Sequence, residues 1–93
     1  MRYAVRYSRA ALTVLKQLRP YDRTAILSSI DRVLTANPTL ESRARVKRLR
    51  QPAAAQYRLR VGEFRVLYDV VGQTVDIVLI LPKAAAGTEQ GEA

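Results

Sequence analysis

Hydrophobic and polar positions change their period once along the first part of the chain, from alternation to helical spacing. From Met1 to Tyr7 they alternate, which predicts a half-buried strand. Ser8 suits the N-cap of a helix whose apolar residues recur at helical spacing as far as Leu18. Pro20 stops that helix, because the residue before a proline avoids the α region. Pro20 also suits the first turn of a second helix. The Asn-Pro pair at 37–38 ends this second helix. So short a connection predicts an antiparallel helical hairpin.

Three further strands are predicted at 56–61, 64–71 and 74–81, where alternation returns. Glycine stands first in both two-residue connections, as a type II′ hairpin turn prefers. Residues 39–55 are expected to form loops and a basic approach to the sheet. The prediction is therefore a single small α+β domain over 1–83 with the order β-α-α-β-β-β, in which the hairpin of helices packs on one face of an antiparallel meander. Residues 84–93 are expected to be a frayed or disordered tail.

Two-residue turns determine which side chains share a face of the meander. The face toward the helices is expected to carry Tyr57, Leu59, Val61, Phe64, Val66, Tyr68, Val70, Val75, Ile77, Leu79 and Leu81. The opposite face is expected to carry Arg58, Arg60, Arg65, Leu67, Asp69, Val71, Asp76, Val78 and Ile80. Arg60 then lies directly across from Arg65, and like charges so placed destabilise a sheet by roughly 0.2–1 kcal/mol. The opposed pair of arginines therefore needs an explanation other than the stability of the sheet.

Composition narrows the chemistry. The chain has 93 residues with a formal net charge of +8, no cysteine and no histidine. These absences exclude thiolate metal sites, metal hydrolases of the usual kind and serine- or cysteine-histidine catalysis, so we expect no metal and no cofactor. No apolar run approaches the roughly 18 residues of a membrane span, and the N-terminus lacks a signal-peptide core. We expect a cytoplasmic protein with no membrane partner.

The positive charge is concentrated in one segment, whose only acidic residue is Glu63. Its basic residues are Arg43, Arg45, Lys47, Arg48, Arg50, Arg58, Arg60 and Arg65. Arg2 and Arg6, which point away from the apolar side of their strand, are expected to extend this set. Such convergence favours a phosphate-binding surface over a merely solvated face. An apolar patch beside it suits a helix or strand of a partner protein.

The stretch 57-YRLRVGEFRVLYDV-70 is similar to a Y-R-[LIV]-R-x-G-[DE]-[YF]-R-[VL]-x-Y pattern. Together with the element order and the preceding VKRLR, it makes residues 2–83 resemble the RelE/ParE superfamily, the toxins of type II toxin–antitoxin pairs. The resemblance implies a toxin bound by an acidic antitoxin in a hetero-oligomer. RelE-like members enter the ribosome and cleave mRNA with the RNA 2′-hydroxyl as nucleophile, whereas ParE-like members act on DNA gyrase. The short helical hairpin looks more RelE-like.

The resemblance also implies roles for individual residues. Arg58 and Arg60 stand where the family often has basic catalytic residues, and Arg65 matches the arginine after the turn. Lys83 is the remaining basic candidate, since the usual last-strand arginine and tail tyrosine are missing. The expected catalytic set is Arg58, Arg60, Arg65 and Lys83, and the expected RNA-binding set is Arg43, Arg45, Lys47, Arg48 and Arg50.

The identity of a general base stays open. Arginine keeps its proton above pH ~12, so it stabilises a phosphorane but is a poor base. Glu63 and Lys83 are the alternatives, while Tyr57 and Tyr68 are expected in the core. The leading hypothesis is a ribosome-dependent mRNA endonuclease that inhibits translation. A toxin that binds DNA gyrase or another target without RNA cleavage is the alternative, and a general RNA-binding domain ranks third because the tyrosines face inward.

Overall fold

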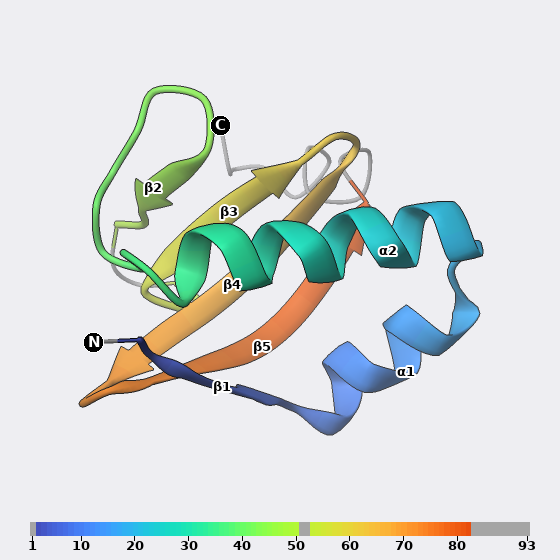
Figure 1. Ribbon diagram of the computed structural model, residues 1–93, viewed down its shortest axis with the longest axis horizontal. Coiled ribbons are helices and arrows are strands. Elements are labelled where there is room, and N and C mark those ends of the chain that lie inside the picture. The colour runs from blue at the N-terminus through green and yellow to red at the C-terminus, as the bar shows by residue number, and fades with distance from the viewer. Residues whose placement is uncertain (1, 51–52, 83–93) are drawn as a thin grey trace.

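A five-stranded sheet carries a pair of helices on one of its faces (Figure 1). The computed structural model describes residues 2–50 and 53–82. The elements in chain order are β1 (Ala4–Tyr7), α1 (Arg9–Gln17), α2 (Pro20–Ser29), the π-helical turn η1 (Ile30–Leu34), β2 (Val46–Arg48), β3 (Tyr57–Val61), β4 (Phe64–Val71) and β5 (Thr74–Pro82). The strands lie in the order β1-β5-β4-β3-β2; β1 is parallel to β5 and the other pairs are antiparallel. The predicted α+β fold is confirmed.

Local hydrogen bonds explain where the first helix begins and ends. The Ser8 hydroxyl accepts the Ala11 N–H at 3.0 Å and donates to the Val78 carbonyl at 2.7 Å, so it caps α1 and ties it to β5. At the other end the Arg23 guanidinium donates to the carbonyls of Leu15 at 2.8 Å and Leu18 at 2.9 Å. The Leu15 carbonyl also accepts the Leu18 N–H at 3.3 Å, so Arg23 of α2 adds to the bonds at the end of α1 and fastens the two helices together. Within the described residues, no helix is long and apolar enough to span a membrane.

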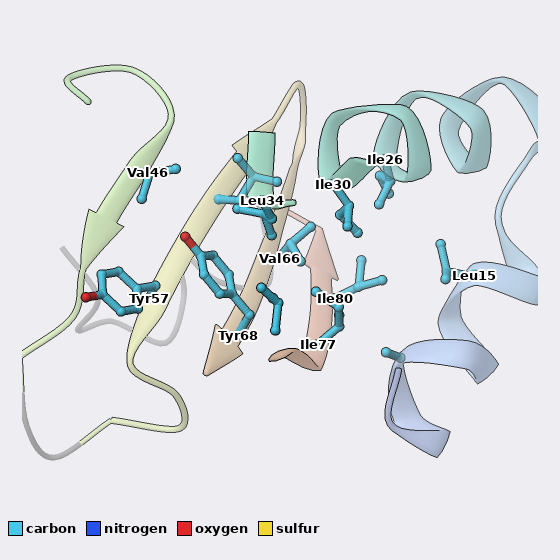
Figure 2. Close-up of a cluster of buried hydrophobic side chains, with 13 residues drawn as sticks. Leu15, Ile26, Ile30, Leu34, Val46, Tyr57, Val66, Tyr68, Ile77 and Ile80 are labelled. Carbon is cyan, nitrogen blue, oxygen red and sulfur yellow. The ribbon is translucent and has the colours of Figure 1, made fainter. Parts of the chain in front are cut away.

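The core lies between the helices and the sheet (Figure 2). Ile26, Ile30 and Leu34 descend from α2 and η1 onto fully buried strand residues such as Val66. Burial of this apolar surface, at roughly 25 cal/mol per Å², is the main stabilising contribution. The core also fixes the register of the strands, because a slip of one residue in the pairing would turn these side chains to the other face of the sheet.

Two tyrosines close the core at the end near β2. The rings of Tyr57 and Tyr68 stack with centroids 5.5 Å apart and an interplanar angle of 15°. The Tyr68 hydroxyl donates to the Pro38 carbonyl at 2.6 Å, and the Tyr57 hydroxyl accepts from the Arg48 guanidinium at 3.0 Å. Both phenols are thus engaged in packing, and their predicted position in the core is confirmed.

The last strand departs from the predicted register. Both two-residue turns are confirmed, with positive φ at Gly62 and Gly72. A β-bulge then interrupts the pairing of β4 with β5 between Leu67 and Tyr68. It inserts one extra residue and thereby exchanges the faces of everything beyond it. Ile80 is therefore buried in the core, and the prediction that Leu79 and Leu81 occupy that face is wrong.

A second departure is β2, which lies in a segment expected to be a loop. Its three residues pair with β3 and form one edge of the sheet. The N–H groups on the outward side of this strand find hydrogen-bond acceptors nearby. The Ser42 hydroxyl accepts the N–H of Val46, and a Glu41 carboxylate oxygen accepts the N–H of Arg48. Because these N–H groups already have acceptors, the short edge strand β2 is protected from pairing with strands of other chains. The predicted tail over 84–93 lies outside the described residues.

Candidate nucleic-acid interface

Cationic side chains project from three neighbouring strands on the sheet face opposite the helices. They are Lys47 of β2, Arg58 and Arg60 of β3, and Arg65 of β4, and we call this set the arginine face. Arg60 lies directly across from Arg65, as predicted, and Lys47 lies across from Arg58. The alternating neighbours Leu59 and Val66 are fully buried on the helix side. Core packing therefore forces the four cations onto one face.

The members of the arginine face differ in exposure. Lys47 and Arg60 are exposed, Arg65 is half-buried, and Arg58 is only 8% exposed. Charged side chains are rarely buried unless they are paired, and both Arg58 and Arg65 have interaction partners in the chain. Lys47 and Arg60 are thus the most exposed cations of this face, and Arg65 is partly accessible beside Arg60. The turn residue Glu63, an alternative for the general base, is exposed at the tip of the β3–β4 hairpin.

The remaining predicted RNA-binding residues lie around β2. The Arg45 carbonyl accepts the N–H of Arg60 at 2.9 Å, which sets exposed Arg45 beside the arginine face. Arg48 points to the other side, where its guanidinium lies 5.2 Å from the centre of the Tyr57 ring. Arg43 and Arg50 are exposed in the segments that flank the strand. The structure thus gathers Arg45 and Lys47 with the predicted catalytic arginines, while Lys83 lies outside the described residues.

The predicted extension of the basic set toward the N-terminus is correct for the face on which Arg6 lies, but both N-terminal arginines are engaged in ion pairs. Arg6 shares the face, but its guanidinium donates to both carboxylate oxygens of Asp76, at 2.9 and 3.3 Å. The hydrogen bond and the charge of Asp76 raise the pKa of Arg6. Arg2 turns toward Asp31 of η1, with 3.5 Å between nitrogen and oxygen. On this face of the sheet, the exposed cations outside these ion pairs are therefore those of β2 and β3, Lys47 and Arg60.

The sequence did not predict a pair of hydrogen bonds that aligns β3 with β4. The Gln56 N–H donates to an Asp69 carboxylate oxygen at 2.8 Å, and the Gln56 side-chain oxygen accepts the Val70 N–H at 2.8 Å. These bonds continue the ladder beyond the end of β3 and engage one of the two acids on the arginine-bearing side. A glutamine before a strand and an aspartate within another carry no recognisable spacing signal.

The described part of the chain contains no cluster of three or more potential metal ligands. Tyr68 is unsuited to proton transfer here, because burial, with a smaller effect from Tyr57, raises its pKa well above the usual value. The arrangement can therefore bind phosphates and stabilise negative charge through arginine and lysine.

Comparison with solved structures identifies the fold. The toxin–antitoxin complex RelBE2 from Mycobacterium tuberculosis contains a chain 27% identical, with a TM-score of 0.73, over 88% of this chain and 99% of that chain. The RelE–RelB complex from Pyrococcus horikoshii gives 24% identity and 0.73 over 89% and 97%. The YoeB dimer from Staphylococcus aureus gives 25% and 0.63 over 87% and 97%. No family model and no curated protein matches the chain. The resemblance to RelE-like toxins is confirmed by these neighbours.

Proposed function

We propose that this chain, whose fold is that of RelE-like toxins, is the toxin of a type II toxin–antitoxin module and a ribosome-dependent mRNA endonuclease that inhibits translation. The observation that carries the proposal is the pairing of Arg60 with Arg65 beside Arg58 and Lys47 on one sheet face. A sheet gains nothing in stability from opposed like charges, whereas an RNA phosphate between them is attracted by both. The face therefore supports a polyanionic ligand.

The proposed reaction places the scissile phosphate over the arginine face. The RNA 2′-oxygen attacks the adjacent phosphorus, the bond to the 5′-oxygen breaks, and the leaving 5′-oxygen takes a proton from water, so that a 2′,3′-cyclic phosphate and a 5′-hydroxyl result. Arg60 and Arg65 hold the phosphate oxygens and stabilise the additional negative charge of the transition state. Much of the rate enhancement comes from holding the 2′-oxygen in line, since positioning alone lowers a barrier by roughly 7–11 kcal/mol in favourable cases.

The proton of the 2′-hydroxyl needs an acceptor that arginine cannot supply. Glu63 is the candidate among the described residues, because it is exposed at the turn that joins the strands of Arg60 and Arg65. Lys83 is the second candidate. Arg45, Lys47, Arg43 and Arg50 contribute binding along the RNA backbone, and Arg48 contributes chiefly through its contact with Tyr57.

The proposal includes partners and a compartment. Solved neighbours of the fold are complexes of a toxin with its antitoxin, RelB in Pyrococcus horikoshii and YefM with YoeB in Staphylococcus aureus. By analogy we propose an acidic antitoxin for this chain in a hetero-oligomer, and ribosomes with mRNA in the cytoplasm as its target. The net charge of +8 is complementary to both kinds of partner.

Primer extension on mRNA in a reconstituted translation reaction tests the proposal. Wild type is compared with the variant Arg60→Ala/Arg65→Ala and with Arg9→Ala/Arg32→Ala, which removes the same charge from exposed positions on the helices. We expect cuts at the ribosomal A site that require ribosomes, disappear in the first variant and persist in the control. Intact mRNA with a protein that still arrests growth would refute the nuclease and make gyrase supercoiling the next assay.

A further inference from the structure

Three leucines lie beside the arginine face on the same side of the sheet. They are Leu67 of β4 and Leu79 and Leu81 of β5, and we call them the leucine strip. Leu67 stands between buried core residues of β4, so it points away from the helices. Leu79 pairs with Leu67 and Leu81 pairs with Arg65, so both share the side of their partners. The β-bulge between Leu67 and Tyr68 thus turns the two leucines of β5 away from the core and toward the cations.

Core packing does not account for the leucine strip. Each of its three side chains is half-buried. Among the residues that the structure describes, none of the three belongs to the core or to the partly buried side chains packed against it. An apolar surface that adjoins a charged surface is a common feature of ligand sites, because apolar contacts supply affinity and the charges orient the ligand. The strip is therefore continuous with the site that begins at Arg60 and Arg65.

Two aspartates border the leucine strip at the end away from the opposed arginines. Asp69 and Asp76 lie directly across from each other on β4 and β5, beyond the paired leucines, and both are half-buried. One Asp69 oxygen accepts the Gln56 N–H at 2.8 Å, and the two Asp76 oxygens accept bonds from Arg6 at 2.9 and 3.3 Å. A carboxylate offers about four lone-pair sites, so each aspartate retains capacity for a further donor.

This side of the sheet thus presents a cation, an apolar side chain and an acid in that order along β4. Arg65, Leu67 and Asp69 follow one another on it, about 7 Å apart along the strand. A nucleotide presents matching groups in the same order, namely an anionic phosphate, the flat face of a base and a base edge with N–H donors. An acidic peptide would be repelled by Asp69 and Asp76, and a basic one by the arginines. The order therefore suits a nucleotide better than a peptide.

We propose that the leucine strip and the two aspartates form a base-selecting subsite next to the scissile phosphate. The opposed arginines hold the phosphate, the base lies on the leucine strip, and the base edge donates to Asp69 and Asp76. Adenine, cytosine and guanine each carry an exocyclic amino group that donates, whereas uracil carries carbonyl oxygens that carboxylates repel. The subsite therefore favours a base with an amino group over uracil. That the bound nucleotide belongs to a cleaved mRNA rests on the proposed function.

Binding of short RNAs tests the subsite apart from cleavage. The probes are fluorescein-labelled uridine pentamers in which the central nucleotide is adenosine, cytidine, guanosine, uridine or an abasic ribose. Every position is 2′-O-methylated, which blocks the nucleophile and leaves the phosphates and bases in place. Fluorescence anisotropy gives the dissociation constants, and the methyl NMR signals of Leu67 and Leu79 locate the base.

Two variants with matched controls isolate the two parts of the subsite. Asp76→Asn removes a carboxylate charge that is paired with an arginine, and its control Asp31→Asn does the same at the ion pair of η1 on the helix side. Leu79→Ala shortens the leucine strip, and its control Leu40→Ala changes a leucine that is 63% exposed and outside the sheet. Circular dichroism checks that each variant is folded.

In wild type we expect the probes with adenosine, cytidine or guanosine to bind about three-fold or more tightly than the all-uridine probe. The abasic probe should bind about five-fold or more weakly than the adenosine probe and should leave the two methyl signals unshifted. Asp76→Asn should abolish the preference over uridine, Leu79→Ala should reduce the advantage of adenosine over the abasic ribose, and both controls should preserve these differences. Equal binding of all probes, no binding, or differences that survive both variants would overturn the subsite.

Cleavage on the ribosome keeps the two proposals separate. Cleavage in the translation reaction by a protein that shows no base preference in the binding assay refutes the subsite alone. A base preference that depends on Asp76, in a protein that leaves mRNA intact on the ribosome, refutes the nuclease alone.

Discussion

Arg60 and Arg65 occupy directly opposed positions on β3 and β4, although each could have been any polar residue without disturbing the core. The hydrophobic partners on the other face, Leu59 and Val66, are what hold the two strands in this register. The stabilisation from burying those side chains exceeds the repulsion between the two arginines. Each buried side chain contributes roughly 1.5–3 kcal/mol, whereas the cross-strand repulsion costs roughly 0.2–1 kcal/mol. The fold therefore tolerates an opposed pair of like charges that an anionic ligand between them would stabilise.

Replacing Arg60 by glutamate should stabilise the protein and remove its activity. The exposed carboxylate would face Arg65, so repulsion across the strands becomes attraction, and we expect the free energy of unfolding in urea to rise by about 0.2–1 kcal/mol. Cleavage of mRNA should be lost, because the same carboxylate repels phosphate. Arg60→Gln, which removes the repulsion alone, should lie between the two in stability. A destabilised Arg60→Glu protein would show that repulsion at this pair is negligible.

Ser8 is expected to contribute to stability through both of its hydrogen bonds. Ser8→Ala removes the cap of α1 and the bond to the Val78 carbonyl at the bulge, and should lower the free energy of unfolding by about 0.5–2 kcal/mol. Thr13→Ala is the control, since the Thr13 hydroxyl also donates to a carbonyl but lies exposed in the middle of α1. Thermal unfolding of both variants measures the contrast. Equal effects would argue against a special role for Ser8.

The alternation of apolar residues was sufficient to predict four strands, both helices, the tight turns and the Arg60–Arg65 pair. Each of these depends on local period and on turns of two residues, which are visible in the sequence. The bulge at Leu67–Tyr68 was not visible, because Val78, Leu79, Ile80 and Leu81 are all apolar and suit either face. Only the tertiary contacts of Ile80 decide which of them is buried.

The short strand β2 escaped prediction for another reason. Only Val46 of its three residues is apolar and buried, so the alternation of apolar and polar residues is too short to predict a strand. It exists because β3 offers an unpaired edge and because Ser42 and Glu41 satisfy its outward N–H groups. Without β2, Lys47 could be assigned to a basic segment but not to the position across from Arg58.

Alkaline pH should destabilise the protein through its buried phenols. Burial raises the pKa of Tyr68 in the folded state, and a group with a raised folded pKa contributes stability that is complete below its unfolded pKa and is lost as pH rises. Tyrosine in an unfolded chain titrates near pH ~10. We expect the free energy of unfolding to fall above that pH, and less steeply in Tyr68→Phe. At neutral pH that variant loses the bond to the Pro38 carbonyl and should be destabilised by about 1–3 kcal/mol, with mRNA cleavage retained. An identical alkaline slope in the variant would assign the effect to other groups.

The salt dependence of RNA binding should report how many cations of the arginine face meet phosphate. For a single strand, log K falls with log salt at a slope of roughly −0.7 per neutralised phosphate. Lys47→Ala and Arg60→Ala, which remove the two exposed members, should each reduce the magnitude of that slope by about 0.7 and weaken binding to different sequences alike. Arg9→Ala on α1 should leave the slope unchanged, since it lies on the helix side of the sheet. Fluorescence titrations of a short RNA between low and moderate salt give the slopes. A full slope in Lys47→Ala and Arg60→Ala together would mean that phosphates bind elsewhere on this chain.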